Sequence, residues 1–150
     1  MSRTASAALS TREILDRFHR AMLDKSADDL ADLYAPDAAH EFPFLFPGMP
    51  ERYEGREEVR AGYRAAWGVS RAAPQEIQEI CEVVVHESVD PEVITVEQTV
   101  CGVVTTTGES LSFPGLLVLR VRNGLIVHAR DYMDGVRVAH TTGRRCRQLG

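Results

Sequence analysis

The sequence predicts an α+β fold, a cone-shaped α+β barrel in which three N-terminal helices pack on a strongly curved, mostly antiparallel sheet. Two observations carry this prediction. Apolar residues recur at helical spacing in three segments of the first half, and from Ile77 onward their period changes to the alternation of strands. Helices that precede a run of adjacent strands are typical of α+β proteins, in which helices cover one face of the sheet.

The first two predicted helices form a hairpin. Ser10 or Thr11 can cap a helix over residues 11–25, because an acidic residue stands in its first turn and apolar residues recur at helical spacing. A second helix follows, and Pro36 is expected to end it because the residue before a proline disfavours the helical conformation.

The next segment is harder to assign. Residues 38–46 alternate in part, but Pro43 permits an edge strand at most, since proline cannot donate to a sheet ladder. Residues 47–55 contain two prolines and two glycines and are predicted to form a loop. Residues 56–67 carry apolar side chains at helical spacing and form the third predicted helix.

Four strands are predicted in the second half. Turn signals of the Asp-Pro, Thr-Gly and Asn-Gly type separate them, and Asn123-Gly124 is the strongest hairpin signal because that dipeptide favours a two-residue turn. The predicted strands span residues 77–87, 93–105, 110–122 and 125–134.

Length and charge limit the possible functions. A chain of 150 residues with 44% hydrophobic residues suits one compact domain, expected over residues 11–138. Residues 1–10 are expected to be disordered, and residues 139–150 form a basic tail. The formal net charge of −5 provides no general basic surface, so a nucleic-acid partner is not expected.

The cysteines argue against a disulfide framework and against a structural zinc site, because there are three of them without C-x-x-C spacing. A reducing cytoplasm fits this pattern best. The first ten residues lack the apolar stretch of a signal peptide, and no segment approaches membrane-spanning length. The chain is therefore predicted to be soluble and cytoplasmic, without a membrane partner.

Asp131 is the first candidate catalytic residue. On a strand with a period of two, Val127, Ala129 and Asp131 share one face, so a carboxylate is expected on an otherwise apolar side of the sheet. Burial of an unpaired carboxylate favours its protonated form, which suits general acid/base work. The alternative is a structural ion pair with Arg130 or Arg120.

The pattern resembles the nuclear transport factor 2-like superfamily, and within it the group of SnoaL-like polyketide cyclases and ketosteroid isomerases. The resemblance covers about residues 11–134 and is specific for the fold but weak for the reaction. Its carriers are Ala35-Pro36-Asp37, Glu41-Phe42-Pro43-Phe44, Glu54-Gly55-Arg56, Asn123-Gly124-Leu125-Ile126 and Arg130-Asp131-Tyr132-Met133-Asp134.

The resemblance implies roles for several residues. An acidic residue at the position of Asp131 handles protons in such enzymes, and His40 stands where the family often presents a polar pocket residue. Gln98 is expected to donate a hydrogen bond in the pocket. Aromatic residues are expected to line it, although each one taken singly is more often ordinary core: Phe18, Tyr34, Phe42, Phe44, Tyr63 and Trp67.

The implied function is that of a cofactor-independent acid/base enzyme. Its substrate would be a small apolar carbonyl compound, isomerised, cyclised or dehydrated through an enolate held by His40 and Gln98. An alternative is epoxide opening as in limonene-epoxide-hydrolase-like enzymes, but Gln98 and Val100 stand where those enzymes carry an arginine and an aspartate. The other alternative is a noncatalytic module that binds a small molecule or a protein.

No metal or cofactor is expected. The five histidines show no metal-ligand spacing, and neither a P-loop nor a dinucleotide-binding fingerprint is present. The resemblance also implies a homodimer that forms through the outer face of the sheet.

Overall fold

Three helices and a six-stranded sheet make up the computed structural model, which describes residues 7–44, 50–72 and 75–134. The order along the chain is α1 (Thr11–Asp24), α2 (Ala27–Ala31), β1 (Tyr34–Glu41), β2 (Arg52–Glu54), α3 (Arg56–Ala72), β3 (Gln75–Glu87), β4 (Val93–Val104), β5 (Ser110–Arg122) and β6 (Leu125–Met133). The parts of the predicted terminal segments in residues 1–6 and 139–150 lie outside the described residues.

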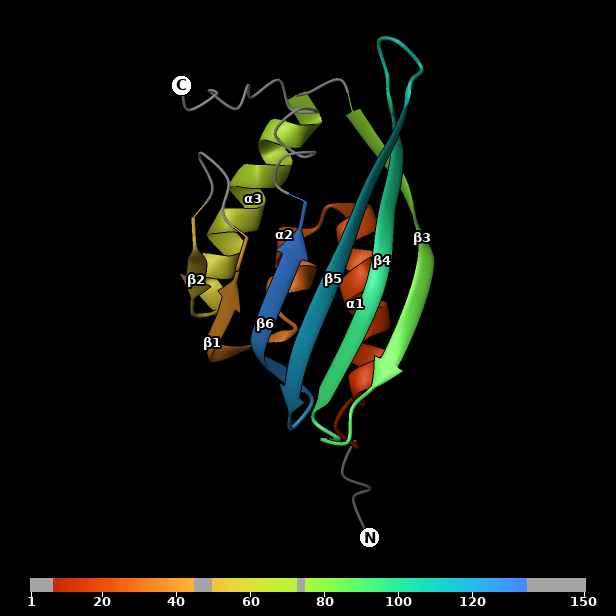
Figure 1. Ribbon diagram of the computed structural model, residues 1–150. Coiled ribbons are helices and arrows are strands. Elements are labelled where there is room, and N and C mark those ends of the chain that lie inside the picture. Colours follow the sequence, from red (N-terminus) through yellow and green to blue (C-terminus); the bar gives the residue numbers. More distant parts are fainter. Residues whose placement is uncertain (1–6, 45–49, 73–74, 135–150) are drawn as a thin grey trace, which may run out of the picture.

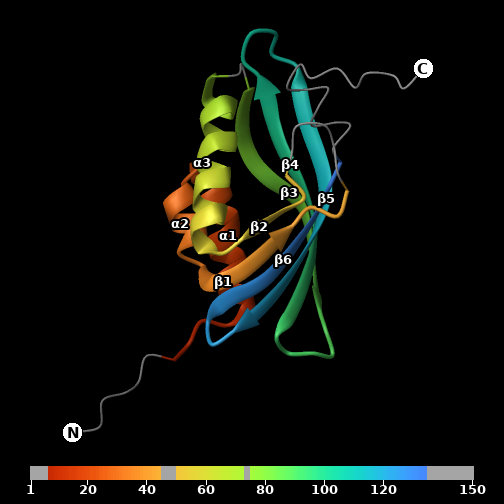
Figure 2. The ribbon, with the colours of Figure 1, turned by 90° about the vertical axis from the view of Figure 1, so that its left-hand side faces the viewer.

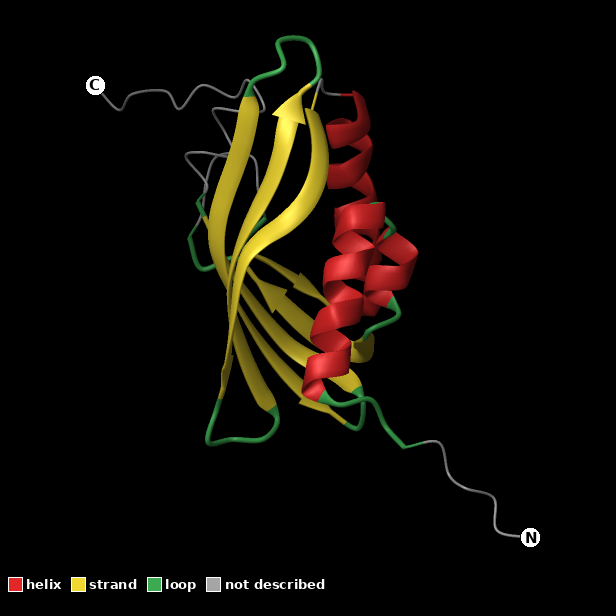
Figure 3. Ribbon diagram, turned by 90° about the vertical axis from the view of Figure 1, so that its right-hand side faces the viewer, coloured by secondary structure: helices red, strands yellow, loops and turns green. Residues whose placement is uncertain are grey.

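The strand order in the sheet is β2-β1-β6-β5-β4-β3 (Figure 1). Strands β1 and β6 run parallel, and every other neighbouring pair is antiparallel. The three helices lie on one face of the strongly bent sheet (Figures 2 and 3). The predicted α+β class and the curved, mostly antiparallel sheet are therefore confirmed, although the sheet stays open with β2 and β3 as its edges.

Helix α1 begins where the sequence predicts. The Ser10 side chain accepts a hydrogen bond from the Glu13 backbone N–H, and the Glu13 side chain binds back to the Ser10 backbone, which completes a capping box. Lys25 adopts a left-handed conformation with φ of 49° and ends the helix. The buried face of α1 packs into the main core with side chains from β4, β5 and β6.

The second helix is shorter than predicted, because the chain enters β1 at Tyr34 and Pro36 lies within that strand. The register of β1 against β6 shifts between Tyr34 and Ala39, so the proline falls in a gap of the ladder where no donor is needed. Strand β1 is not the predicted edge strand, since β2 and β6 flank it and Pro43 follows its end. Part of the predicted loop forms β2.

The Asn123-Gly124 turn joins β5 and β6 as predicted. Both residues have positive φ, 52° and 76°, and Arg122 pairs directly with Leu125, which is the geometry of a two-residue hairpin. A register shift follows on β6, where Val127 is the extra residue of a bulge. Ala129 stays on the buried face, and the bulge sets the direction of the strand that leads to Asp131.

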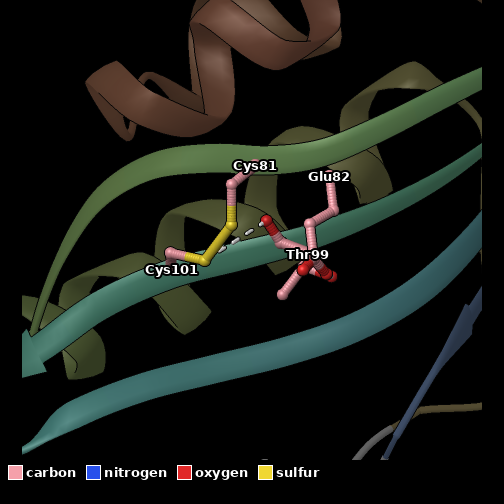
Figure 4. Close-up of a disulfide and its surroundings, with 4 residues drawn as sticks. All are labelled: Cys81, Glu82, Thr99 and Cys101. Carbon is pink, nitrogen blue, oxygen red and sulfur yellow. Dashed lines mark hydrogen bonds between the residues drawn. A yellow bond between two sulfur atoms is a disulfide. The ribbon is translucent and has the colours of Figure 1, made fainter.

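One expectation about the cysteines is wrong. Cys81 on β3 and Cys101 on β4 form a disulfide, although the odd cysteine count argued against one (Figure 4). Cys81 pairs with Thr99, so Cys101 lies two residues along β4 and the two side chains meet diagonally across the strands. The bridge joins the edge strand β3 to the rest of the sheet next to a register shift.

We expect this disulfide to stabilise the fold by about 3 kcal/mol, because it closes a loop with a sequence separation of 20 and thereby restricts the unfolded chain. The variant Cys81→Ala/Cys101→Ala should unfold at a lower urea concentration than the wild type. Dithiothreitol should lower the urea midpoint of the wild type by the same amount. The reductant should leave the double variant unchanged. Equal midpoints for reduced and oxidised wild type would contradict the prediction.

Candidate functional site

The inner face of the sheet carries a compact polar cluster between β1, β6 and α3. His40 is fully buried on β1, directly beside Ala129 of β6. Its Nε2 atom lies 3.6 Å from Oδ2 of Asp131, whose side chain is 16% exposed. The structure thus brings the two candidate catalytic residues together, with Asp131 the more accessible of the pair.

Two tyrosines complete the cluster. The Tyr34 hydroxyl lies 2.6 Å from His40 Nδ1, and the Tyr63 hydroxyl lies 3.1 Å from His40 Nε2. The pKa values of Tyr34 and Tyr63 are both raised well above the usual tyrosine range. The larger cause is burial, and the second is the negative charge of Asp131. Both hydroxyls therefore keep their protons at neutral pH and remain hydrogen-bond donors.

One arrangement of protons satisfies both hydrogen bonds of His40. With Tyr34 as the donor to Nδ1, Nε2 carries a proton that points to the Tyr63 oxygen. The Tyr63 hydroxyl also interacts with the Asp131 carboxylate, which contributes to its raised pKa. Asp131 therefore lies beside both the imidazole and the Tyr63 hydroxyl.

Aromatic rings surround the imidazole. Phe42, Tyr53 and Tyr63 have ring centroids 4.8, 6.3 and 5.5 Å from that of His40, and Trp67 packs on Tyr63 at 4.9 Å. Tyr53 is absent from the predicted site because residues 47–55 were assigned to a loop. In the structure, Tyr53 on β2 is the direct neighbour of His40 on β1, and this pairing brings its ring to the imidazole.

Other predicted site residues lie elsewhere. Phe18 is 2% exposed in the core beneath α1, whereas Phe44 is 62% exposed and its ring lies against Tyr132. Gln98 is buried on β4, where its Oε1 accepts a hydrogen bond from Nε2 of His19, 2.6 Å away. His19 on α1 is a polar partner that the sequence reasoning did not identify.

Neither Arg130 nor Arg120 forms the ion pair with Asp131 that the noncatalytic alternative requires. Arg130 approaches Glu41, at 3.7 Å, and Arg120 binds Asp90 and Glu92 at 2.9 and 3.3 Å. Both predicted partners of Asp131 are therefore occupied by other carboxylates. Asp131 interacts instead with the imidazole and the Tyr63 hydroxyl.

Two surface hollows lie away from this cluster. One, of about 430 Å³, lies between α1 and the β5–β6 turn, and its lining includes Arg17 and Leu125. The other, of about 270 Å³, lies between Lys25 and Trp67. Within the described ranges no group of three potential metal ligands occurs, and no described helix is both long and apolar enough to cross a membrane.

Residues 15–129 match the family described as the SnoaL-like domain. The chain belongs to the SnoaL-like domain family. An uncharacterized PhzA/B-like protein of Pseudomonas aeruginosa is 30% identical to this SnoaL-like domain over 136 residues, which cover 90% of this chain and 92% of that protein.

Solved structures agree with the family. A crystal structure of a candidate isomerase from Bacillus subtilis is 26% identical, has a TM-score of 0.75, and matches over 91% of this chain and 95% of its own. A candidate polyketide cyclase from Pseudomonas putida is 16% identical, with a TM-score of 0.65 over 89% and 98% of the two chains. That second likeness concerns the fold alone.

His19 makes the stability of this SnoaL-like domain depend on pH. Burial lowers the pKa of His19, although the bond to Gln98 and the charge of Asp16 act in the opposite direction. The unfolded chain, where the histidine pKa is higher, therefore binds the proton more readily, and the free energy of unfolding contributed by His19 decreases as pH falls below about 6.5.

We expect urea unfolding at pH 7.5 and 5.5 to show a smaller stability loss in His19→Gln than in the wild type. His86→Gln is the matched control, because His86 is 53% exposed and its ion pair with Glu97 lies at the surface. The prediction fails if both variants lose as much stability between the two pH values as the wild type.

Proposed function

We propose that this protein is a cofactor-independent acid/base enzyme that isomerises, cyclises or dehydrates a small apolar carbonyl compound through an enolate. The observation that carries the proposal is the partly exposed Asp131 carboxylate, which lies beside the His40 imidazole and the Tyr63 hydroxyl on the inner face of the sheet and has no arginine partner among the described residues. Membership of the SnoaL-like family supports it.

The chemistry assigns a different part to each side chain. Asp131 would remove a proton from the carbon next to the carbonyl group and return it at a later step. His40 is fully buried, so it would act through Asp131 as a positioning residue, with its own orientation fixed by Tyr34. Tyr63 keeps its proton and would donate a hydrogen bond to the carboxylate or to the developing enolate oxygen.

The surroundings favour an apolar substrate. Tyr53 and Trp67 are partly exposed and provide aromatic surface next to the polar cluster, with Phe42 buried against Tyr53, and this surface suits a ring system with few polar groups. A noncatalytic module would need no carboxylate beside a buried imidazole and a tyrosine hydroxyl. We therefore rank binding without turnover below catalysis.

Proton exchange tests the proposal without knowledge of the natural substrate. The protein is incubated in D₂O with a panel of cyclic monoketones, fused-ring diketones and terpenoid ketones, and deuterium incorporation next to the carbonyl is followed by NMR. We expect catalysed exchange in at least one class. Exchange no faster than with heat-denatured protein across the panel would overturn the assignment.

A further inference from the structure

The larger of the two surface hollows has the features of a separate ligand site. Its volume of about 430 Å³ lies within the range of about 300–1,000 Å³ that is typical of small-molecule sites. None of the described residues that line it belongs to the polar cluster around His40 and Asp131. The apolar side chains of the lining are all aliphatic: Leu9, Ala21, Leu33 and Leu125.

Small residues keep this part of the surface hollow. Ala21 of α1 packs into the core with a single methyl group, and Gly124 in the β5–β6 turn has no side chain at all. Gly124 has a positive φ of 76°, and a Cβ atom there would come within 3.0 Å of the Leu9 backbone nitrogen. The segment that precedes α1 therefore passes close to the turn and forms one wall of the hollow (Figure 2).

Two arginines of α1 border the hollow. Arg17 and Arg20 are exposed and three residues apart, so their side chains leave the helix at neighbouring positions. Neither forms an ion pair or a hydrogen bond with another residue in the described part of the chain. Every arginine outside α1 whose side chain the structure describes contacts a carboxylate or, in one case, a backbone carbonyl. The guanidinium groups of Arg17 and Arg20 are thus left to bind an anion.

Two aspartates also border the hollow, but they do not cancel the arginines. Asp32 accepts a hydrogen bond from Arg60, at 3.0 Å, and so belongs to the ion pairs that join α2 to α3. Asp29 alone stands against the charges of Arg17 and Arg20. The hollow therefore has an excess of one positive charge beside an aliphatic surface, which complements a ligand with one negative charge and an apolar body.

We propose that this hollow binds an aliphatic carboxylate, with the carboxylate group between Arg17 and Arg20 and the hydrocarbon chain against Leu33 and Leu125. The two oxygens of a carboxylate match the paired N–H donors of a guanidinium group. The aliphatic lining offers no ring on which an aromatic ligand could stack, so a hydrocarbon chain is favoured. This site is independent of the proposed reaction, since it uses no residue of the polar cluster.

Calorimetric titration at pH 7.5 with two matched probes tests the role of the charge. Octanoate carries a carboxylate, and 1-octanol has the same chain without the charge. At low ionic strength we expect the wild type to bind octanoate about tenfold more tightly than 1-octanol, because each exposed ion pair contributes modestly. In about 1 M salt the difference should largely disappear, because exposed charges are then screened.

Variants of the exposed arginines separate binding from folding. Arg17→Gln/Arg20→Gln should bind octanoate and 1-octanol equally well. Arg12→Gln is the matched control, because Arg12 is exposed on the same helix and does not line the hollow, so this variant should keep the wild-type preference. Arg17→Glu/Arg20→Glu reverses the charge and should prefer octylammonium to octanoate.

Nuclear Overhauser effects from labelled leucine methyl groups locate the bound chain. We expect contacts between octanoate and the methyl groups of Leu33 and Leu125. Contacts confined to the rings of Tyr53 and Trp67 would place the ligand at the polar cluster and overturn the inference. Equal affinity of the wild type for octanoate and 1-octanol, or wild-type octanoate affinity in Arg17→Gln/Arg20→Gln, would overturn it as well.

Discussion

Replacement of Asp131 by asparagine is expected to reduce deuterium exchange by at least about 10³-fold while the protein remains folded. Asparagine has nearly the same shape and still accepts a hydrogen bond from Tyr63, but it cannot take up a proton from carbon. General-base contributions typically amount to about 10²- to 10⁴-fold, and Asp131 is the base that the proposed reaction uses.

Stability decides how this result is interpreted. Asp131 is partly exposed and has no arginine partner in the described part of the chain, so we expect the melting temperature of Asp131→Asn to stay within about 4 °C of the wild type, equivalent to less than about 1 kcal/mol. The matched control is Glu97→Gln, which neutralises a carboxylate that is 59% exposed and pairs with His86. Unfolding of Asp131→Asn, or full exchange activity, would contradict the catalytic assignment.

The position of Asp131 on the inner face of the sheet could be predicted because its signal is local. Alternation along the last strand places Ala129 and Asp131 on one face, and the Asn123-Gly124 turn fixes where that strand begins. The bulge at Val127 is not visible in the alternation. It does not disturb the prediction, because both residues of interest lie beyond it.

Longer-range features of the site escape such reasoning. Pro36 signals the end of a helix, but Tyr34 already belongs to a strand, and only the packing of β1 shows that its hydroxyl reaches His40. His19 and Gln98 are 79 residues apart, and no spacing rule connects them.

The disulfide was missed for a similar reason. The register of β3 against β4 brings Cys81 and Cys101 together, whereas the odd cysteine count alone argues against any pairing. Sequence periodicity therefore predicts faces of elements, but not which side chains on different elements meet.

His40→Ala is expected to lower both activity and stability. The imidazole is fully buried, so its removal leaves a cavity and deprives the Tyr34 and Tyr63 hydroxyls of a partner. Together these effects should lower the free energy of unfolding by about 2–4 kcal/mol. Loss of the contact that holds Asp131 should also slow exchange, by less than in Asp131→Asn, because the carboxylate that removes the proton is still present.

A second variant separates positioning from folding. His40→Asn retains a polar group near the Tyr34 hydroxyl, so it should recover part of the stability, yet it cannot reach toward Asp131 as the imidazole does. If His40 acts through Asp131, His40→Asn lowers kcat with little change in KM, because a fully buried group makes no contact with bound substrate. A folded His40→Asn protein with the wild-type kcat would remove His40 from the mechanism and leave Tyr63 as the partner that orients the carboxylate.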